Sequence, residues 1–299
     1  MAQFRQPTAT NLPGNLRGSD TSHQPGERRF AYYWGRRRAK IATLMPQDQR
    51  EMERLDFQHH LLRQVCGRNY LAPIAWPESI LDVGCGTGRW AIEMADEFPA
   101  AVVVGVDLLP PAPYGWSPGN CFFQYASILD ALPFSDGAFD FVHQRCFLDA
   151  VPYQAWSHVV HELLRVTSPR GTVEVLEFGL PPSLGPGLSA LYQLMIDLAT
   201  RQGFDLGLAD RLGWFLHSAE AVNIATQAIA IPLGRHGGRL GALAQTNLMS
   251  VFRTLRAAFI QLRLINEVAF DALLDEARHE LETGRHILPV HVYVTQRPG

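Results

Sequence analysis

The stretch "ILDVGCGTGRW", residues 80–90, decides the fold of this chain. An apolar run enters a turn that contains Gly84, Gly86 and Gly88, and the continuation "GRWAIEMADEF" has the pattern of a helix that ends before Pro99. This order predicts a β-strand, a glycine-rich turn and a helix. Many α/β proteins hold a cofactor on such a turn.

The same alternation continues downstream. Strands are expected over residues 101–107, 120–127, 138–144 and 171–179, and a helix over 153–167. Strands that are nearly all apolar and are separated by helices predict a mostly parallel sheet with helices on both faces. We therefore expect an α/β, Rossmann-like fold whose ligand lies outside the carboxyl ends of the strands.

Helical patterns dominate the C-terminal part of the chain. Helices are expected at about 186–203, 207–220, 240–263 and 266–283, and two further strands over 221–234 and 287–297. The stripe of Phe252, Leu255, Phe259 and Leu262 gives one of these helices a wide apolar face. A helical block between two strands of a sheet is either a cap over the ligand crevice or ordinary core packing, and the sequence leaves both open.

The N-terminal part differs again in composition. Residues 1–27 are rich in Pro, Gly, Ser and Thr, whereas "PQDQREMERLDFQHHLLRQVC", residues 46–66, has helical spacing. We expect a mobile N-terminal arm over residues 1–45. A single domain over 46–299 would follow, with helical cap insertions at about 182–220 and 235–283.

Charge and cysteine content narrow the class of protein. The formal net charge of the 299 residues is −3, but residues 1–40 carry eight basic and two acidic residues, which leaves −9 for the rest. A nucleic-acid partner is therefore disfavoured. The four cysteines form no CxxC, so no metal site is expected. No apolar run is long enough for a membrane span and no signal peptide is evident, so we expect a cytoplasmic protein. The oligomeric state stays open, a homodimer included.

The glycine turn itself discriminates between cofactors. A dinucleotide fingerprint would need glycine where Arg89 stands. Asp82, ahead of the first glycine, would repel a diphosphate but would form a charge-assisted bond to an ammonium group, directly or through water. Asp107 ends the second strand, where a carboxylate accepts ribose hydroxyls. An amino-acid tail beside a ribose describes S-adenosylmethionine.

With these residues the chain resembles the class I S-adenosylmethionine-dependent methyltransferases, whose seven-stranded sheet has an antiparallel last strand. The resemblance rests on "LDVGCGTG", "GVD", "SILDALPFSDGAFDFVHQR" and "ELLRVTSPRGTVEVLEF", and covers about residues 50–180. A closer resemblance to the fungal secondary-metabolism regulator methyltransferases and their bacterial relatives rests on "LMPQDQREMERLDFQHHLL", "YLAPI" and "GRWAIEMADEFP".

The resemblance implies a set of cofactor-binding residues. Ser127 stands where the family often has an acid that bonds the adenine amine, and Asp130 is the alternative for that role. We also expect Tyr33 to fold over the cofactor from the N-terminal side, or else to anchor the arm. The full expected set is Tyr33, Asp82, Gly84, Cys85, Gly86, Gly88, Asp107, Leu108, Ser127, Ile128 and His143.

The catalytic residues follow from the reaction type. Methyl transfer is an in-line displacement, so positioning supplies most of the catalysis and a base is needed only for a weakly acidic acceptor. His143 and Glu177 are the candidates, with packing as the alternative role of His143. We expect methyl transfer to a small molecule, a natural product as the candidate. The alternative is a protein methyltransferase or a cofactor-binding regulator of secondary metabolism. "HQRC" stands where amino-group nucleic-acid methylases carry N/D-P-P-Y, which disfavours that third class.

Overall fold

A computed structural model describes residues 30–33, 36–39, 43–110 and 117–299. Most of the expected arm over 1–45 lies outside these residues. Its expected mobility therefore stays a prediction. Two short strands are described within it, β1 (Phe30–Tyr33) and β2 (Arg36–Ala39), which pair antiparallel with Phe30 opposite Ala39. The sequence had given no sign of this hairpin.

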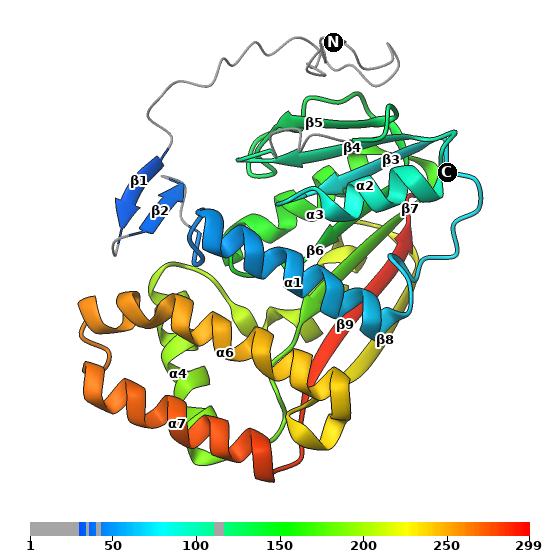
Figure 1. The fold of residues 1–299 in the computed structure, drawn as a ribbon. Helices are drawn as coiled ribbons and strands as arrows, with labels where there is room; N and C mark the ends of the chain where they lie inside the picture. Colours follow the sequence, from blue (N-terminus) through cyan, green and yellow to red (C-terminus); the bar gives the residue numbers. More distant parts are fainter. Residues whose placement is uncertain (1–29, 34–35, 40–42, 111–116) are drawn as a thin grey trace, which may run out of the picture.

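The centre of the molecule is a seven-stranded sheet in the order β5-β4-β3-β6-β7-β9-β8 (Figure 1). Strands β3 to β7 run parallel to one another, whereas β9 runs antiparallel to both of its neighbours, β7 and β8. The expected seven-stranded sheet with its antiparallel last strand is therefore confirmed. The bounds are β3 Ser79–Val83, β4 Val102–Asp107, β5 Cys121–Tyr125, β6 Phe139–Arg145, β7 Thr167–Phe178, β8 Val222–Leu233 and β9 His286–Gln296.

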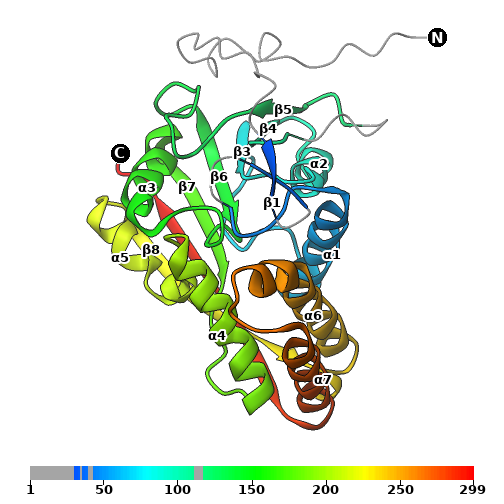
Figure 2. The same ribbon diagram turned by 90° about the vertical axis from the view of Figure 1, so that its left-hand side faces the viewer.

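Helices cover both faces of the sheet, as the near-continuous apolar strands require. On one face lie α3 (Trp156–Val166) and α5 (Leu212–Ser218), which pack together, and on the other lies α2 (Arg89–Glu97) (Figure 2). Trp90 and Met94 of α2 pack fully buried against Ile80 and Phe141 of the strands. The chain crosses from one side of β3 to the other between β5 and β6, so the carboxyl ends of the adjacent strands β3 and β6 border a crevice.

A second group of helices lies beyond the ends of the strands. It consists of α1 (Gln49–Cys66), α4 (Pro186–Arg201), α6 (Gly238–Gln261) and α7 (Glu267–Thr283), which share one core cluster with parts of β7, β8 and β9 (Figure 1). Asp48 caps α1 through its Oδ1, which accepts a hydrogen bond from Glu51 N at 3.1 Å, and Gly67 ends it with a φ of 74°. The helix expected over 46–66 is thus confirmed.

The expected apolar stripe is shorter than its spacing suggested. Phe252, Leu255 and Phe259 are fully buried on α6, but Leu262 is 38% exposed because the helix ends at Gln261. Within the expected insertion at 182–220, α5 packs on the sheet beside α3, whereas α4 packs on α6 and α7. The helical block therefore provides core packing, and its role as a cap stays a prediction.

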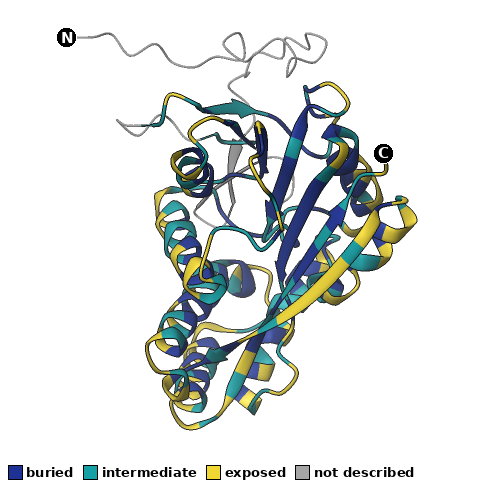
Figure 3. Cartoon of the chain, turned by 90° about the vertical axis from the view of Figure 1, so that its right-hand side faces the viewer, coloured by how far each residue is buried: buried dark blue, intermediate teal, exposed yellow. Residues whose placement is uncertain are grey.

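Strand β8 forms one edge of the sheet. Its first residues, from Val222 to Ala230, are exposed or half-buried, whereas Ile231 and Leu233 are buried next to α6 (Figure 3). No helix within the described residues is long and apolar enough to cross a membrane.

Candidate active site

A cavity of about 300 Å³ lies at the carboxyl ends of the central strands. The glycine turn after β3, the end of β4 and the segments that follow β5 and β6 form its floor, and α1, α4 and α6 form its walls. Among the expected cofactor-binding residues, those on the cavity wall are Gly84, Cys85, Gly86, Asp107, Leu108, Ser127 and Ile128. Most of the cofactor-binding residues expected from the sequence therefore lie on one surface.

Backbone bonds hold the glycine turn against β4. The amide nitrogens of Gly84 and Cys85 donate to Val106 O at 2.8 and 3.0 Å, and the Gly86 nitrogen donates to Asp107 Oδ2 at 3.0 Å. Gly84 has a φ of +72°, and a Cβ on it would lie 2.2 Å from Cε2 of Phe147. Only glycine satisfies both conditions, so the ring of Phe147 and the turn are fitted to each other. Gly88 caps α2 and does not itself reach the cavity wall.

Asp107 is positioned by the turn that it supports. Its Oδ2 accepts from Gly86 N, and its Oδ1 accepts from Leu109 N at 2.9 Å. Burial raises the pKa of this carboxyl group, while the backbone hydrogen bonds oppose the rise. Each carboxylate oxygen can accept a further hydrogen bond. Two adjacent hydroxyl groups, such as those of a ribose, suit this arrangement.

The segment after β5 borders the same cavity. Ser127 is buried and Ile128 beside it lines the wall, whereas Asp130 is exposed and does not. The Ser127 hydroxyl accepts from Leu129 N at 3.3 Å. Of the two alternatives for an adenine contact, Ser127 is therefore the one that reaches the cavity.

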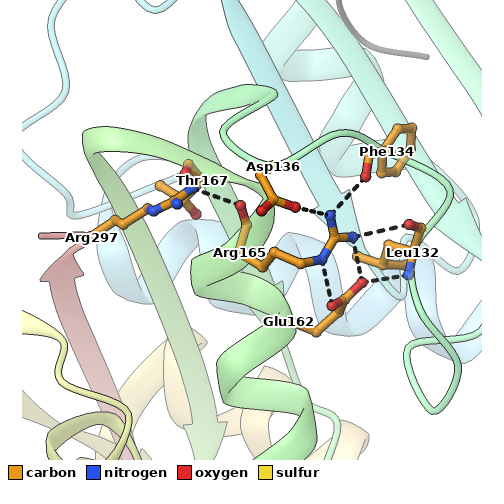
Figure 4. A network of polar contacts seen from close by, with 7 residues as sticks. All are labelled: Leu132, Phe134, Asp136, Glu162, Arg165, Thr167 and Arg297. Atoms are coloured by element: carbon orange, nitrogen blue, oxygen red, sulfur yellow. Dashed lines mark hydrogen bonds and ion pairs between the residues drawn. The ribbon is translucent and has the colours of Figure 1, made fainter. Parts of the chain in front are cut away.

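An arginine network fixes the loop that follows this segment (Figure 4). Arg165 on α3 donates to the carbonyl oxygens of Leu132 and Phe134 at 3.0 and 2.8 Å, and to the carboxylate of Glu162 at 2.7 and 2.8 Å. Arg297 then donates to the carbonyl oxygen of Arg165 at 2.8 Å. Helix α3 and the C-terminal end of the sheet thus hold the residues downstream of Ser127 in place.

Asp82 and His143 form a buried pair behind the turn. The Nδ1 atom of His143 lies 3.3 Å from Asp82 Oδ1, its Nε2 lies 3.8 Å from Glu174 Oε1, and its ring stacks on Trp90 with centroids 3.9 Å apart. Neither Asp82 nor His143 is on the cavity wall. Within the described part of the chain, Asp82 Oδ2 accepts no hydrogen bond, so this oxygen is left for another donor. His143 thus lies behind the turn, and its catalytic role stays a prediction.

Glu177 does lie on the cavity wall, at the end of β7. Its Oε1 accepts from Gln144 Nε2 at 2.6 Å and from Phe147 N at 2.7 Å, whereas its Oε2 accepts only a long bond of 3.4 Å from Leu148 N. Burial raises the pKa of Glu177 to about 8, and these hydrogen bonds oppose the rise. The carboxyl group is therefore poised to gain or lose a proton near neutral pH.

Several residues of the cavity were missed by the sequence reasoning. Arg54 and Gln58 on α1, Tyr192 on α4, and Asn247 on α6 all line it. They come from helices far apart in the chain, so spacing could not reveal that they meet. His59, also on α1, lines the wall with its Nδ1 2.8 Å from Arg145 Nη2; burial lowers its pKa, which favours the neutral ring.

The expected role of Tyr33 stays a prediction. Its backbone belongs to β1, opposite Arg36, but its side chain lies outside the described part of the structure, as does the neighbouring Trp34.

Comparison with known proteins gives the class. Residues 80–171 match the model of the family described as "Methyltransferase domain". The chain is 31% identical to methyltransferase str3 of Strobilurus tenacellus, over 73% of this chain and 77% of that protein. It is 29% identical to N-methyltransferase sirN of Leptosphaeria maculans, over 72% and 79%. It is 33% identical to the secondary metabolism regulator laeA of Aspergillus niger, over 60% of this chain and half of that protein.

The chain belongs to the class I S-adenosylmethionine-dependent methyltransferases. The expected resemblance to the fungal regulator-type methyltransferases is also confirmed. The cavity fits the cofactor of this class in two respects. The glycine turn brings the backbone of Gly84 and Gly86 to the cavity wall, and Asp107 lines the same space.

Proposed function

We propose that this enzyme moves a methyl group from S-adenosylmethionine to a small-molecule acceptor, a natural product as the candidate. The observation that carries the proposal is the acceptor side of the cavity, where α4 and α6 present apolar side chains toward the glycine turn. These are Met195, Leu248, Val251 and Leu255. A concave site with apolar walls and a few polar groups suits a small ligand.

The cofactor site of the proposal uses the floor of the cavity. The glycine turn from Gly84 to Gly88 would hold the methionine end, and Asp82 Oδ2, behind the turn, would accept from its ammonium group directly or through water. Asp107 would accept the ribose hydroxyls, and Leu108, Ser127 and Ile128 would border the adenine. The structure suggests a supporting role for His143, which orients Asp82 through the Oδ1 contact and the stacking on Trp90.

Proton transfer would fall to Glu177. S-adenosylmethionine, when bound, supplies an electrophilic methyl group. The chain supplies position, an apolar enclosure that excludes water, and a carboxylate whose pKa of about 8 permits it to hold the acceptor's proton at Oε2. Oε1 accepts hydrogen bonds from Gln144 and Phe147, whereas Oε2 accepts only the long bond from Leu148 N. Oε2 is therefore the oxygen that can take the proton.

A labelling experiment tests the proposal. The protein is incubated with S-adenosylmethionine carrying a labelled methyl group, together with a panel of apolar phenols, amines and carboxylic acids, or with a protein extract. We expect the label in the fraction extracted with organic solvent. Label that appears only in protein would instead support the alternative function, a protein methyltransferase. The similarity to the Aspergillus niger regulator is the reason for testing this alternative.

The proposal also covers the domain division of the chain and the location of the protein in the cell. We propose one domain over 46–299 in which α4, α6 and α7 act as the helical cap, and a cytoplasmic location that fractionation of cells would test. The oligomeric state is left to measurement.

A further inference from the structure

A buried polar cluster lies in the wall between α1 and α6. Arg54 Nε donates to both oxygens of Glu51 at 2.9 and 3.0 Å, and its Nη2 donates to Glu51 Oε1 at 2.7 Å. Its Nη1 donates to Gln58 Oε1 at 2.7 Å and to Asn247 Oδ1 at 3.3 Å. All four side chains line the cavity, and each has less than a tenth of its surface exposed.

The arginine determines how the two amides face. A guanidinium group only donates, so the oxygen of Gln58 and the oxygen of Asn247 must both point to Arg54. The NH₂ groups of the two amides then point away from it. In the described part of the chain neither NH₂ group has a hydrogen-bond partner, although both residues are buried in the cavity wall. Among the described residues, neither nitrogen is one of the fully buried side-chain atoms that lack a partner, so both open onto the cavity, where a ligand can accept their hydrogen bonds.

Tyr192 on α4 adds a third polar group to the cavity wall. It is 5% exposed, its ring packs edge-to-face on Phe252, and among the described residues its hydroxyl has no partner. Burial raises the pKa of this hydroxyl, so it stays protonated and can donate. Three side chains on α1, α4 and α6 thus offer hydrogen-bond donors to one cavity.

The charge of this subsite is balanced. Arg54 and Glu51 form an ion pair whose charges cancel, and Gln58, Asn247 and Tyr192 are neutral. The neighbouring wall is apolar, with Leu248, Val251 and Met195. A charged ligand group at Gln58, Asn247 and Tyr192 would be desolvated with no counter-charge on these three side chains, although Asp149 on the same cavity acts electrostatically on Arg54.

The subsite lies next to the glycine turn. Leu55 follows Arg54 on α1, and its Cδ1 would be 3.4 Å from a Cβ built on Gly86. A ligand held by Gln58 and Asn247 would therefore lie close to the segment where the methyl donor is proposed to sit. The cluster thus belongs to the acceptor half of the cavity.

We infer that Asn247, Gln58 and Tyr192 form an acceptor-binding subsite for an apolar molecule with an uncharged hydrogen-bond-accepting oxygen, such as a ketone, ester or amide carbonyl. This inference rests on the proposed function, and it names the substrate class. Specificity arises because a ligand that fills the cavity shields these donors from water: a ligand oxygen accepts their hydrogen bonds, whereas a ligand without one leaves them unpaired.

A set of probes with one skeleton tests the subsite. 2-Acetonaphthone carries the neutral carbonyl, 2-isopropylnaphthalene has a similar shape without it, 2-naphthoate is an anion, and 2-(aminomethyl)naphthalene is a cation. Binding of each to the full chain, with S-adenosylhomocysteine present, is measured by ligand-observed NMR titration. We expect the ketone to bind about tenfold more tightly than the hydrocarbon, as one net hydrogen bond gives. Both ions should bind more weakly than the ketone.

Variants assign the effect to the subsite. Asn247→Leu removes the amide, and Asn247→Asp keeps the oxygen that bonds Arg54 but removes the NH₂ donors. Both should reduce the preference for the ketone over the hydrocarbon to about threefold or less. Asn247→Asp, which introduces a negative charge, should in addition favour the cationic probe. Gln245→Leu, on the same helix but off the cavity wall, is the matched control and should leave the preference unchanged.

The affinity for S-adenosylhomocysteine separates the two proposals. If it binds wild type and variants alike while the ketone shows no preference over the hydrocarbon, the subsite inference is overturned and the proposed function stands. An unchanged ketone preference in Asn247→Asp overturns it as well. If S-adenosylhomocysteine does not bind wild type, the proposed function fails, and the inference that rests on it fails too.

Discussion

Glu177 gives the sharpest prediction about pH. Its carboxyl group is 1% exposed, and burial raises its pKa from 4.5 to about 8. Below pH 4.5 both the folded and the unfolded chain hold the proton. Between pH 4.5 and 8 the unfolded chain releases it while the folded chain keeps it, so folding stability falls as the pH rises through this window. The difference between 4.5 and about 8 corresponds to about 5 kcal/mol at most.

The variant Glu177→Gln mimics the protonated form and should remove this loss. Its NH₂ group replaces Oε2, which accepts only the 3.4 Å bond from Leu148 N, so the shorter bonds to Oε1 are kept. We expect wild type and variant to be similarly stable at pH 5. At pH 9 the variant should be more stable, by an amount of order several kcal/mol.

Urea unfolding, followed by circular dichroism between pH 5 and pH 9, measures the effect. Glu282→Gln, an exposed substitution on α7, is the matched control and should run parallel to wild type at every pH. If Glu177→Gln also runs parallel to wild type, or loses stability relative to it as the pH rises, then the burial of Glu177 has no such penalty. The assignment of this group as a proton acceptor would then lose its physical basis.

Three further changes test the site and its support. Gly84→Ala places a methyl group against the ring of Phe147 at a positive φ. The free energy of unfolding should therefore fall by about 1–3 kcal/mol, and the affinity for the cofactor should fall as well. Adding Phe147→Ala should restore part of the stability and part of the affinity. Asp107→Asn should weaken S-adenosylhomocysteine at least tenfold by calorimetry with little change in melting temperature, and unchanged affinity would remove its ribose role. Arg165→Met leaves the buried carboxylate of Glu162 unpaired and should cost about 2–4 kcal/mol in denaturant unfolding; a loss below 0.5 kcal/mol would refute the importance of the network.

The sheet was predictable because local patterns encode it. Apolar strands, the glycine turn and the helix ends are each read from a few neighbouring residues, and the parallel order follows from their alternation with helices. The hairpin of β1 and β2 has no such pattern, since its "FAYY" and "RRRA" segments do not alternate between apolar and polar residues.

The spacing of residues in the sequence could not reveal which side chains line the acceptor side of the cavity. Arg54 and Asn247 are 193 residues apart, and their contact depends on the packing of α1 on α6. The orientation of His143, in contrast, could have been predicted from the sequence. Successive residues of a strand face opposite sides, so His143 shares a face with Phe141, two residues before it. That face packs on Trp90 of α2, which explains why His143 turns away from the cavity.

The central claim is that the glycine turn and Asp107 hold S-adenosylmethionine. Isothermal titration of the full chain with S-adenosylhomocysteine tests it most directly. We predict one site per chain with micromolar affinity in wild type and a loss of at least tenfold in Asp107→Asn. No binding to the folded wild-type chain, or equal binding to wild type and Asp107→Asn, would contradict the claim.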